Sequence, residues 1–278
     1  MSILVFTILV ILGSVSAGML GALTGLGGGM VIVPMLTLLF HVDIRYAIGA
    51  SLVSVIATSS GAAAAYVKEG YTNVRVGMLL EIATTVGALG GAYLAGRIGT
   101  GAIAVIFAIV LLYSAYRSTR PLTEHVSAEN EDPLSRRLRL ASTYPTAHGL
   151  QPYGVQNVPA GFGLMGLAGV LSGLLGIGSG ALKVLAMDQL MHLPFKVSTT
   201  TSNFMIGVTA AASAGIYLAR GYIDPALALP VMLGVLAGAL VGARILAHAN
   251  TRVLRRIFAV VIIALALEMA YKGISGAL

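Results

Sequence analysis

The sequence predicts an all-α, polytopic membrane protein built from two homologous repeats. The mean hydropathy is +0.92 and only 10% of the 278 residues are charged, whereas water-soluble domains carry about 25% charged residues. Long apolar runs recur along the chain, and they show no alternation of polar and apolar residues. Because backbone groups in lipid must pair internally, these runs are expected to be helices rather than strands of a transmembrane barrel.

The apolar stretches supply the predicted membrane segments. A helical crossing needs about 20 apolar residues. The first 40 residues contain no charged side chain and no basic n-region, so we expect them to be part of the protein and not a cleaved signal. The stretches free or nearly free of charge cover residues 1–40, 46–67, 76–96, 98–116, 158–182, 197–219, 225–243 and 257–271.

An internal repeat divides the chain. A shift of 151 positions aligns the halves without a gap over about 80 residues, and chance matches in low-complexity sequence do not readily pair histidines and tyrosines in one register. The predicted organisation is a first membrane repeat (1–117), a polar linker (118–157) and a second membrane repeat (158–278). The matched pairs include Gly25/Gly176, Gly27/Gly178, Gly29/Gly180, His41/His192, Ser51/Ser202, Thr58/Thr209 and Tyr66/Tyr217.

Each repeat has the same predicted plan. An apolar helix runs into a glycine cluster, a short apolar piece follows (30–41 and 181–192), and three spanning helices complete the half. The glycine-broken pair is either a re-entrant hairpin or one broken crossing. The region 117–157 is charged, contains four prolines and shows no strong periodicity, so it is expected to be an exposed linker.

The distribution of basic residues indicates inverted repeats. If the broken pair makes no net crossing, each half crosses three times, and twelve basic residues lie on the linker side. Only Arg45, Arg97, Arg220 and Lys272 then lie on the other side. A single broken crossing gives parallel repeats and a ratio of nine to seven. The positive-inside rule favours the inverted arrangement, with a cytoplasmic linker and both termini outside.

The glycine clusters are the first candidate site. Glycines interrupt otherwise good helices and leave backbone amides that lipid cannot satisfy, so such breaks belong beside a cavity or against protein. Paired helix breaks near the midplane are typical of anion sites in secondary transporters. The alternative is that the glycines only permit close helix packing. The candidate residues are Gly25, Gly27, Gly28, Gly29, Gly176, Gly178, Ser179 and Gly180.

Polar side chains within the apolar spans extend the candidate site. The third segment of each half opens with small hydroxyl residues, joined by Asn203 in the second half. They could replace the hydration shell of an oxyanion or could simply bond their own helix or a neighbouring one. From these we select Ser51, Ser54, Thr201, Ser202 and Asn203 as substrate-binding candidates.

Each charged residue within the apolar spans has a functional and a purely structural interpretation. Lys183 lies one turn after Gly180 and could attract an anion, or its amine could reach an interface. Glu81 and Glu268 could carry a coupling proton, or each could pair with an arginine near a membrane edge. His41 and His192 end the short pieces and are expected to be interfacial.

Other chemistries find no support in the sequence. There are no cysteines, and no arrangement of ligands or of nucleophile, base and acid predicts a metal site, a cofactor or an enzyme. The net charge of +7 comes from basic residues in short loops, which indicates membrane orientation rather than nucleic-acid binding.

At these residues the sequence resembles the TauE/SafE family of sulfite exporters over nearly its whole length. The first-half signature is Gly25-Leu26-Gly27-Gly28-Gly29 followed by Val33-Pro34, and the second half carries Ser172 to Gly180, then Lys183-Val184, then Thr199 to Met205. Ser179 stands where many members have glycine, and Leu185 where the second half often has proline. The resemblance implies two related halves and transport of small, largely sulfur-containing anions such as sulfite and sulfonates.

The predicted function is therefore a secondary transporter of a small anion in the cell membrane. A transporter of a cation or neutral solute, or a membrane-embedded accessory or enzymatic subunit, is the alternative. The expected partners are the bilayer and a small anionic substrate, and the sequence leaves room for a homo-oligomer. Substrate, direction and coupling ion do not follow from the sequence.

Overall fold

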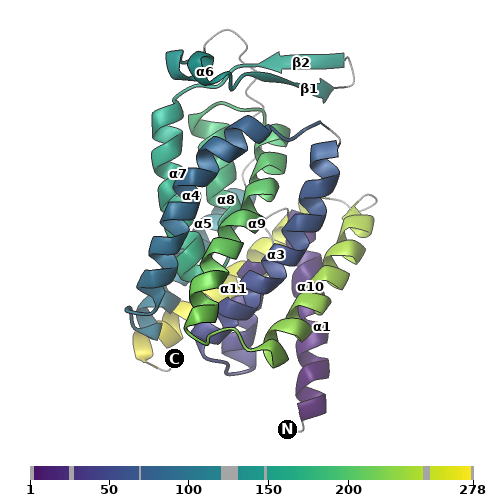
Figure 1. Ribbon diagram of the computed structural model, residues 1–278. Coiled ribbons are helices and arrows are strands. Elements are labelled where there is room, and N and C mark those ends of the chain that lie inside the picture. Colours follow the sequence, from purple (N-terminus) through teal and green to yellow (C-terminus); the bar gives the residue numbers. More distant parts are fainter. Residues whose placement is uncertain are drawn as a thin grey trace.

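A computed structural model describes residues 3–24, 28–68, 70–119, 131–146, 149–246 and 251–276 as a bundle of long helices with a small β-hairpin at one end (Figure 1). The first half contains α1 (Ile3–Thr24), α2 (Gly29–Pro34), the π-helical segment η1 (Met35–Leu39), α3 (Ile44–Lys68), α4 (Val74–Ala95) and α5 (Thr100–Thr119). Then come α6 (Pro133–Leu138), β1 (Ser142–Thr146) and β2 (Gly149–Tyr153). The second half contains α7 (Val158–Leu175), α8 (Gly180–Leu185), the π-helical segment η2 (Ala186–Leu190), α9 (Phe195–Ala219), α10 (Pro225–Leu246) and α11 (Thr251–Ser275).

The two halves repeat each other's secondary structure. Each of α8, η2, α9, α10 and α11 begins 151 residues after its first-half counterpart; α2, for example, begins at Gly29 and α8 at Gly180. The turns after the π-helical segments also match, with φ of 54° at His41 and 55° at His192. The segment η2 begins at the same repeat position as η1 although Leu185 replaces Pro34, so the π-helical turn does not depend on that proline.

Contacts between glycines and facing backbones give the directions of the helices. In α4 and α7, Cβ atoms on Gly87 and Gly91 would meet the carbonyls of Gly166 and Val170, so these helices run in the same direction. The helices α1 and α10 are also parallel, since Gly234 and Gly238 face the carbonyls of Ile11 and Val15.

The equivalent helices α3 and α9 run in opposite directions. Near the start of α3, Gly49 lies against Tyr222, just beyond the end of α9. Farther along α3, Ser59 lies against Gly207 in the middle of α9. The equivalent helices α5 and α11 also pack against each other.

The first glycine-broken pair forms a hairpin. The rings of Phe6 and Phe40 stack edge to face at 5.6 Å, and Gly13 faces the thioether of Met35, so α2 and η1 return antiparallel to α1. The returning piece, Gly29–Leu39, has eleven residues and is about 16 Å long. That is half of a bilayer core of about 30 Å. The chain therefore comes back to the end of the bundle from which α1 started.

The chain is a multi-pass membrane protein by the length and composition of its helices. Within the described ranges, five helices are long and apolar enough to span a bilayer. They expose large apolar side chains on their outer surfaces, as lipid-facing helices do. The five segments are Leu4–Gly21, Val74–Ala95, Val158–Leu175, Phe195–Ala219 and Pro225–Gly242, and shorter apolar helices cover Gly29–Leu39, Ile44–Ser60 and Thr100–Tyr116.

The linker is more ordered than its sequence predicts. Residues 131–155 form a cap, which comprises α6, β1 and β2, at one end of the bundle (Figure 1). Leu140, Tyr144, Tyr153 and Val155 are buried and join a core with residues of α4, α7, η2 and α9. These four side chains pack against the membrane helices, whereas Leu134, Leu138 and Leu150 are exposed. The absence of strong periodicity in the sequence therefore did not anticipate α6, β1 and β2, although most described residues of the linker are exposed or half-buried.

We call the end of the bundle that carries the cap the linker face. Asn73 forms hydrogen bonds that connect several elements there. The Asn73 carboxamide oxygen accepts a hydrogen bond from the Val76 amide at 3.1 Å and so caps α4. Its Nδ2 donates to the Leu140 carbonyl and to the Tyr153 hydroxyl, both at 2.9 Å. The Asn73 backbone amide donates to Thr201 Oγ1 of α9 at 3.0 Å. One buried residue therefore connects the cap to two membrane helices.

Asn73→Ala is expected to lower the free energy of unfolding by about 2 kcal/mol, because it removes a helix cap and leaves two buried partners without their hydrogen bonds. The measurement is the thermal midpoint of the purified protein in detergent. Val74→Ala, at the exposed next position, is the control. Equal midpoints for the two variants would show that the cap is not held by this side chain.

Candidate functional site

The second glycine break is a left-handed turn between α7 and α8. Gly176, Gly178 and Ser179 have φ values of 66°, 71° and 47°, a conformation that favours glycine. Ser179 therefore adopts a glycine-like conformation, at the position equivalent to Gly28 in the first half. In the first break, Gly28 precedes α2 and Gly29 begins it. Gly25 and Gly27 lie outside the described residues.

The two breaks are in direct contact. A Cβ atom built on Gly29 would lie 3.1 Å from the Gly176 carbonyl oxygen and 3.2 Å from Cα of Ile177. The Ser51 hydroxyl of α3 donates to the same Gly176 carbonyl at 2.8 Å. The glycines allow the two interrupted helices to meet where neither could approach with side chains present.

The candidate hydroxyl residues divide into two groups. Ser51 bonds the Gly176 carbonyl, and its repeat counterpart Ser202 donates to the Gly180 carbonyl at 3.3 Å, so both contact the second break. Ser54 instead donates to the Ser51 carbonyl of its own helix at 2.7 Å. Thr201 accepts the Asn73 amide at the linker face, and Asn203 is half-buried on α9.

Lys183 is fully buried one turn after the second break. Its Nζ donates to Thr209 Oγ1 of α9 at 2.5 Å, and Thr209 Oγ1 lies 2.7 Å from Glu81 Oε1 of α4. The Thr85 hydroxyl, one turn along α4, also donates to Oε1 at 3.2 Å. We call Lys183, Thr209 and Glu81 the polar triad, and it joins three helices.

Two buried oxygen atoms beside this network have no hydrogen-bond partner among the described residues. One is Glu81 Oε2, and the other is the hydroxyl of Ser179, which is 1% exposed. Ser179 directly precedes α8, and its carbonyl accepts the Lys183 amide at 3.1 Å. Buried polar atoms in native proteins are nearly always bonded, so these two point to a ligand or to water.

The first half has no equivalent of the polar triad. The repeat shift places Ile32 opposite Lys183, Thr58 opposite Thr209 and Met232 opposite Glu81. Thr58 Oγ1 donates within its own helix, to the carbonyls of Ser54 and Val55. The two breaks thus occupy equivalent positions in the repeats. Of the two equivalent sets of residues, the one beside the second break contains the charged pair Lys183 and Glu81.

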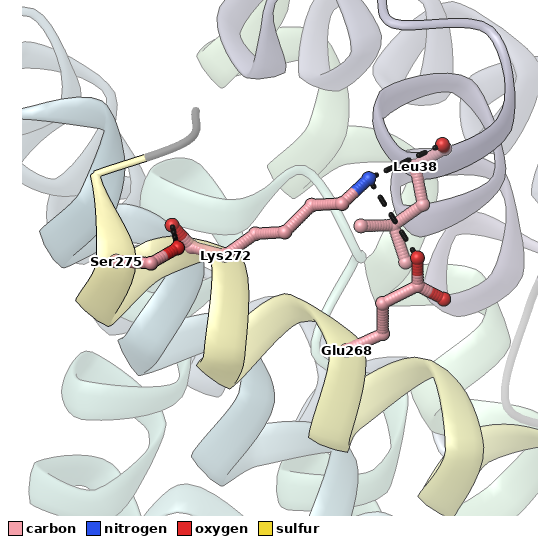
Figure 2. A network of polar contacts seen from close by, with 4 residues as sticks. All are labelled: Leu38, Glu268, Lys272 and Ser275. Carbon is pink, nitrogen blue, oxygen red and sulfur yellow. Dashed lines mark hydrogen bonds and ion pairs between the residues drawn. The ribbon is translucent and has the colours of Figure 1, made fainter.

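Glu268 lies away from the breaks. Its Oε1 is 3.6 Å from Lys272 Nζ, its side chain is 49% exposed, and Lys272 also donates to the Leu38 carbonyl at the end of η1 (Figure 2). Of the two acidic candidates, only Glu81 lies in the polar triad. Glu268 has the alternative role of an ion pair at a helix end, with a lysine as partner and not the expected arginine.

Three features of the site were not predicted from the sequence. Thr209, which bridges the two charges, was noted only as a repeat match, and Thr85 was not noted. Asp188, buried in η2, was overlooked as an intramembrane carboxylate. The pairing of Glu81 with Lys183 had one available signal, since a lysine deep in an apolar segment requires a nearby acid. The described residues contain no group of three or more acidic or histidine side chains placed to hold a metal.

Comparisons with known proteins agree with this architecture. The family model "Sulfite exporter TauE/SafE" matches residues 10–269. The chain is 31% identical to the "Probable membrane transporter protein YunE" of Bacillus subtilis (strain 168) over 277 residues, covering 97% of this chain and 98% of the relative. It is 29% identical to the "Probable membrane transporter protein YdhB" of the same strain, covering 85% and 89%. No solved structure gives a significant match. The chain belongs to the sulfite exporter TauE/SafE family and is a membrane transporter, not an enzyme.

Proposed function

We propose that the protein is a secondary transporter of small anions, with sulfur-containing oxyanions and organosulfonates as the substrate class. The observation that carries the proposal is the fully buried Lys183 one turn from the break, beside a Ser179 hydroxyl that has no partner among the described residues. A buried cation and an unbonded donor suit an oxyanion, which offers negative charge and several acceptor atoms.

The glycine breaks supply the place for the substrate. The break at Gly176–Ser179 leads into a helical piece, α8 and η2, that continues for eleven residues to Leu190. Amides at the start of such a helix lack intrahelical acceptors and carry partial positive charge. The contact of Gly29 with Gly176 brings the first break to the same point. The substrate therefore binds beside the point where the two breaks meet, at the start of α8.

Alternating access follows from an inverted-repeat arrangement. Its support is the opposite direction of the equivalent helices α3 and α9, together with the parallel pairs α1 with α10 and α4 with α7. Halves related in this way can present the same site first to one side of the membrane and then to the other. In this arrangement each half contributes a re-entrant hairpin and three spanning helices.

The basic residues support an orientation with the linker in the cytoplasm. Arg45 donates to the Ile98 carbonyl and lies over the Tyr222 ring, and Arg220 donates to the carbonyls of Ala92 and Tyr93. These two basic residues therefore lie at the end of the bundle opposite the cap. Lys196 and Arg75, in contrast, contact Tyr71 and the Arg139 carbonyl at the linker face. The positive-inside rule places the face richer in basic residues in the cytoplasm.

Proteoliposome flux measurements test the proposal. The panel contains sulfite, thiosulfate, sulfoacetate, methanesulfonate, taurine and simple carboxylates, with a monovalent cation as the opposing class. Anion counterflow is expected for the protein and not for empty vesicles. Transport of the cation, or of no solute in the panel, would contradict the proposal.

Lys183→Met is expected to raise the apparent KM for the transported anion by at least about tenfold, because it removes the buried charge that offsets the anion. Lys272→Met, which removes a partly exposed lysine at the opposite face, is the matched control and should leave the KM unchanged. An unaltered KM in Lys183→Met would make Lys183 a structural residue.

A further inference from the structure

We propose that Glu81 carries the coupling proton, so that a monovalent anion moves together with one proton in an electroneutral symport. This inference rests on the proposed function. When no anion is bound, the ionised Glu81 carboxylate balances the positive charge of Lys183 in place of the substrate. Protonation of Glu81 then frees the lysine charge for the incoming anion.

The charge balance of the polar triad supports this coupling. Lys183 and Glu81 interact electrostatically across Thr209, and both are buried, at 0% and 8% exposure. With both ionised, their charges sum to zero. A monovalent anion entering alone would leave a net negative charge within the protein, which is costly in a medium of low polarity. An anion entering with one proton on Glu81 restores the sum to zero.

The hydrogen bonds of the triad accommodate both protonation states. A hydroxyl group has one proton to donate and can accept two hydrogen bonds. When Glu81 is ionised, the Thr209 proton points to Oε1 at 2.7 Å. When Glu81 is protonated, its O–H can donate to Thr209, and the Thr209 proton turns to the Met205 carbonyl, which lies 3.0 Å away. Lys183 keeps its bond to Thr209 in both states.

The two long helices packed against α4, α7 and α9, contain no carboxyl group of their own. The helix α7 contains no ionisable residue. On α9, Lys196 lies over the Tyr71 ring at the linker face, and Tyr217 approaches the Leu174 carbonyl toward the opposite end. Asp188 of η2 is buried about one and a half turns beyond Lys183, toward the linker face. The electrostatic partner of Lys183 is Glu81.

The position of the polar triad also indicates from which side of the protein Glu81 exchanges its proton. The equivalent positions beside the first break are Ile32 of α2 and Met232 of α10, and neither is ionisable. Of these two equivalent sets of positions, the one beside α8, which leads to the linker face, contains the proton-binding side chain Glu81. Glu81 lies two turns into α4 from its start at that face. Proton exchange with water is therefore expected when the site opens toward the cap.

The test uses proteoliposomes and two measurements with methanesulfonate, a monovalent sulfonate whose charge is constant near neutral pH. An imposed pH gradient should drive accumulation of about tenfold per pH unit, and an imposed membrane potential alone should drive none. Counterflow without a gradient reports carriage of the anion by itself. Counterflow with no response to the pH gradient would overturn the coupling and leave the proposed function standing. Loss of counterflow with every anion of the panel would instead remove the proposed function.

Glu81→Gln tests the residue. The amide resembles the protonated acid, so the variant should retain measurable counterflow, lose accumulation driven by the pH gradient at least about tenfold, and become sensitive to membrane potential. Glu268→Gln, at the exposed carboxyl group, should keep the response of the unmodified protein. Accumulation by Glu81→Gln that still follows the pH gradient would overturn the assignment. If Glu81→Gln does not fold, the potential-insensitive, pH-driven accumulation of the unmodified protein decides the question of electroneutral coupling.

Discussion

Gly178→Val is expected to reduce anion transport to background while folded protein remains in the membrane. Gly178 has a φ of 71°, and a Cβ atom there would lie 2.9 Å from Ile206 Cγ2 and 3.2 Å from Val55 Cγ1. A β-branched residue would therefore push α3 and α9 away from the break. The backbone strain is about 1–3 kcal/mol, less than the about 5–15 kcal/mol that stabilises a typical protein, so the fold should survive while the site does not.

Counterflow of a transported anion, normalised to the amount of reconstituted protein, measures this effect. Gly221→Val is the matched control, because Gly221 has a similar φ of 75° but no atom within 4 Å of its Cβ position. It introduces the same backbone strain away from the site. Normal transport by Gly178→Val would remove the second break from the mechanism, and equal loss in both variants would attribute the effect to strain alone.

Gly173→Val is expected to prevent folding. A Cβ atom on Gly173 would lie 2.0 Å from the Ala88 carbonyl oxygen and 2.8 Å from the Ala92 amide nitrogen. These are backbone atoms of α4, so the contact cannot be relieved by a side-chain rotation. Small residues at four-residue spacing let membrane helices approach this closely, and here Gly169 and Gly173 face α4 while Gly87 and Gly91 face α7. Separating the helices would forfeit the packing of the whole pair.

The yield of monodisperse protein after extraction in mild detergent measures the outcome, and a fall of at least about tenfold is expected from a destabilisation of more than about 1.4 kcal/mol. Gly163→Val lies on the same helix with open space around its Cβ position and should express normally. A folded Gly173→Val protein with an unchanged thermal midpoint would show that α4 and α7 are not held at this separation.

Much of the fold could be predicted because it depends on local features. The apolar runs predicted where the helices lie. The repeat of 151 positions predicted that equivalent helices begin and end at equivalent residues, as α3 and α9 do, and likewise α4 and α10. Glycine clusters end helices for a local reason, and the break at Gly176 was predicted on that ground. The order in the cap was missed because its strands have five residues each and contain Pro145 and Pro152, so neither shows the periodicity of a typical strand.

The glycines themselves proved to have two roles, and the sequence alone could not separate them. Gly169 and Gly173 lie inside a continuous helix and admit a neighbouring backbone, which is the packing role. Gly176 and Gly178 have positive φ values and lie where the helix is interrupted, which is the role expected of glycines at a substrate site. Both sets occupy one short stretch of apolar sequence. Only the backbone conformation distinguishes them.

The sequence by itself determined that the chain resides in lipid, that it consists of two similar halves, and that each half is interrupted by glycines, because hydropathy, repetition and backbone freedom are properties of neighbouring residues. Only the tertiary structure decided which polar groups act together. Glu81, Lys183 and Thr209 lie on three helices and come within hydrogen-bond distance through the packing of α4 and α8 against α9. Distances between residues so far apart in the chain depend on how whole helices pack, and no local pattern encodes them.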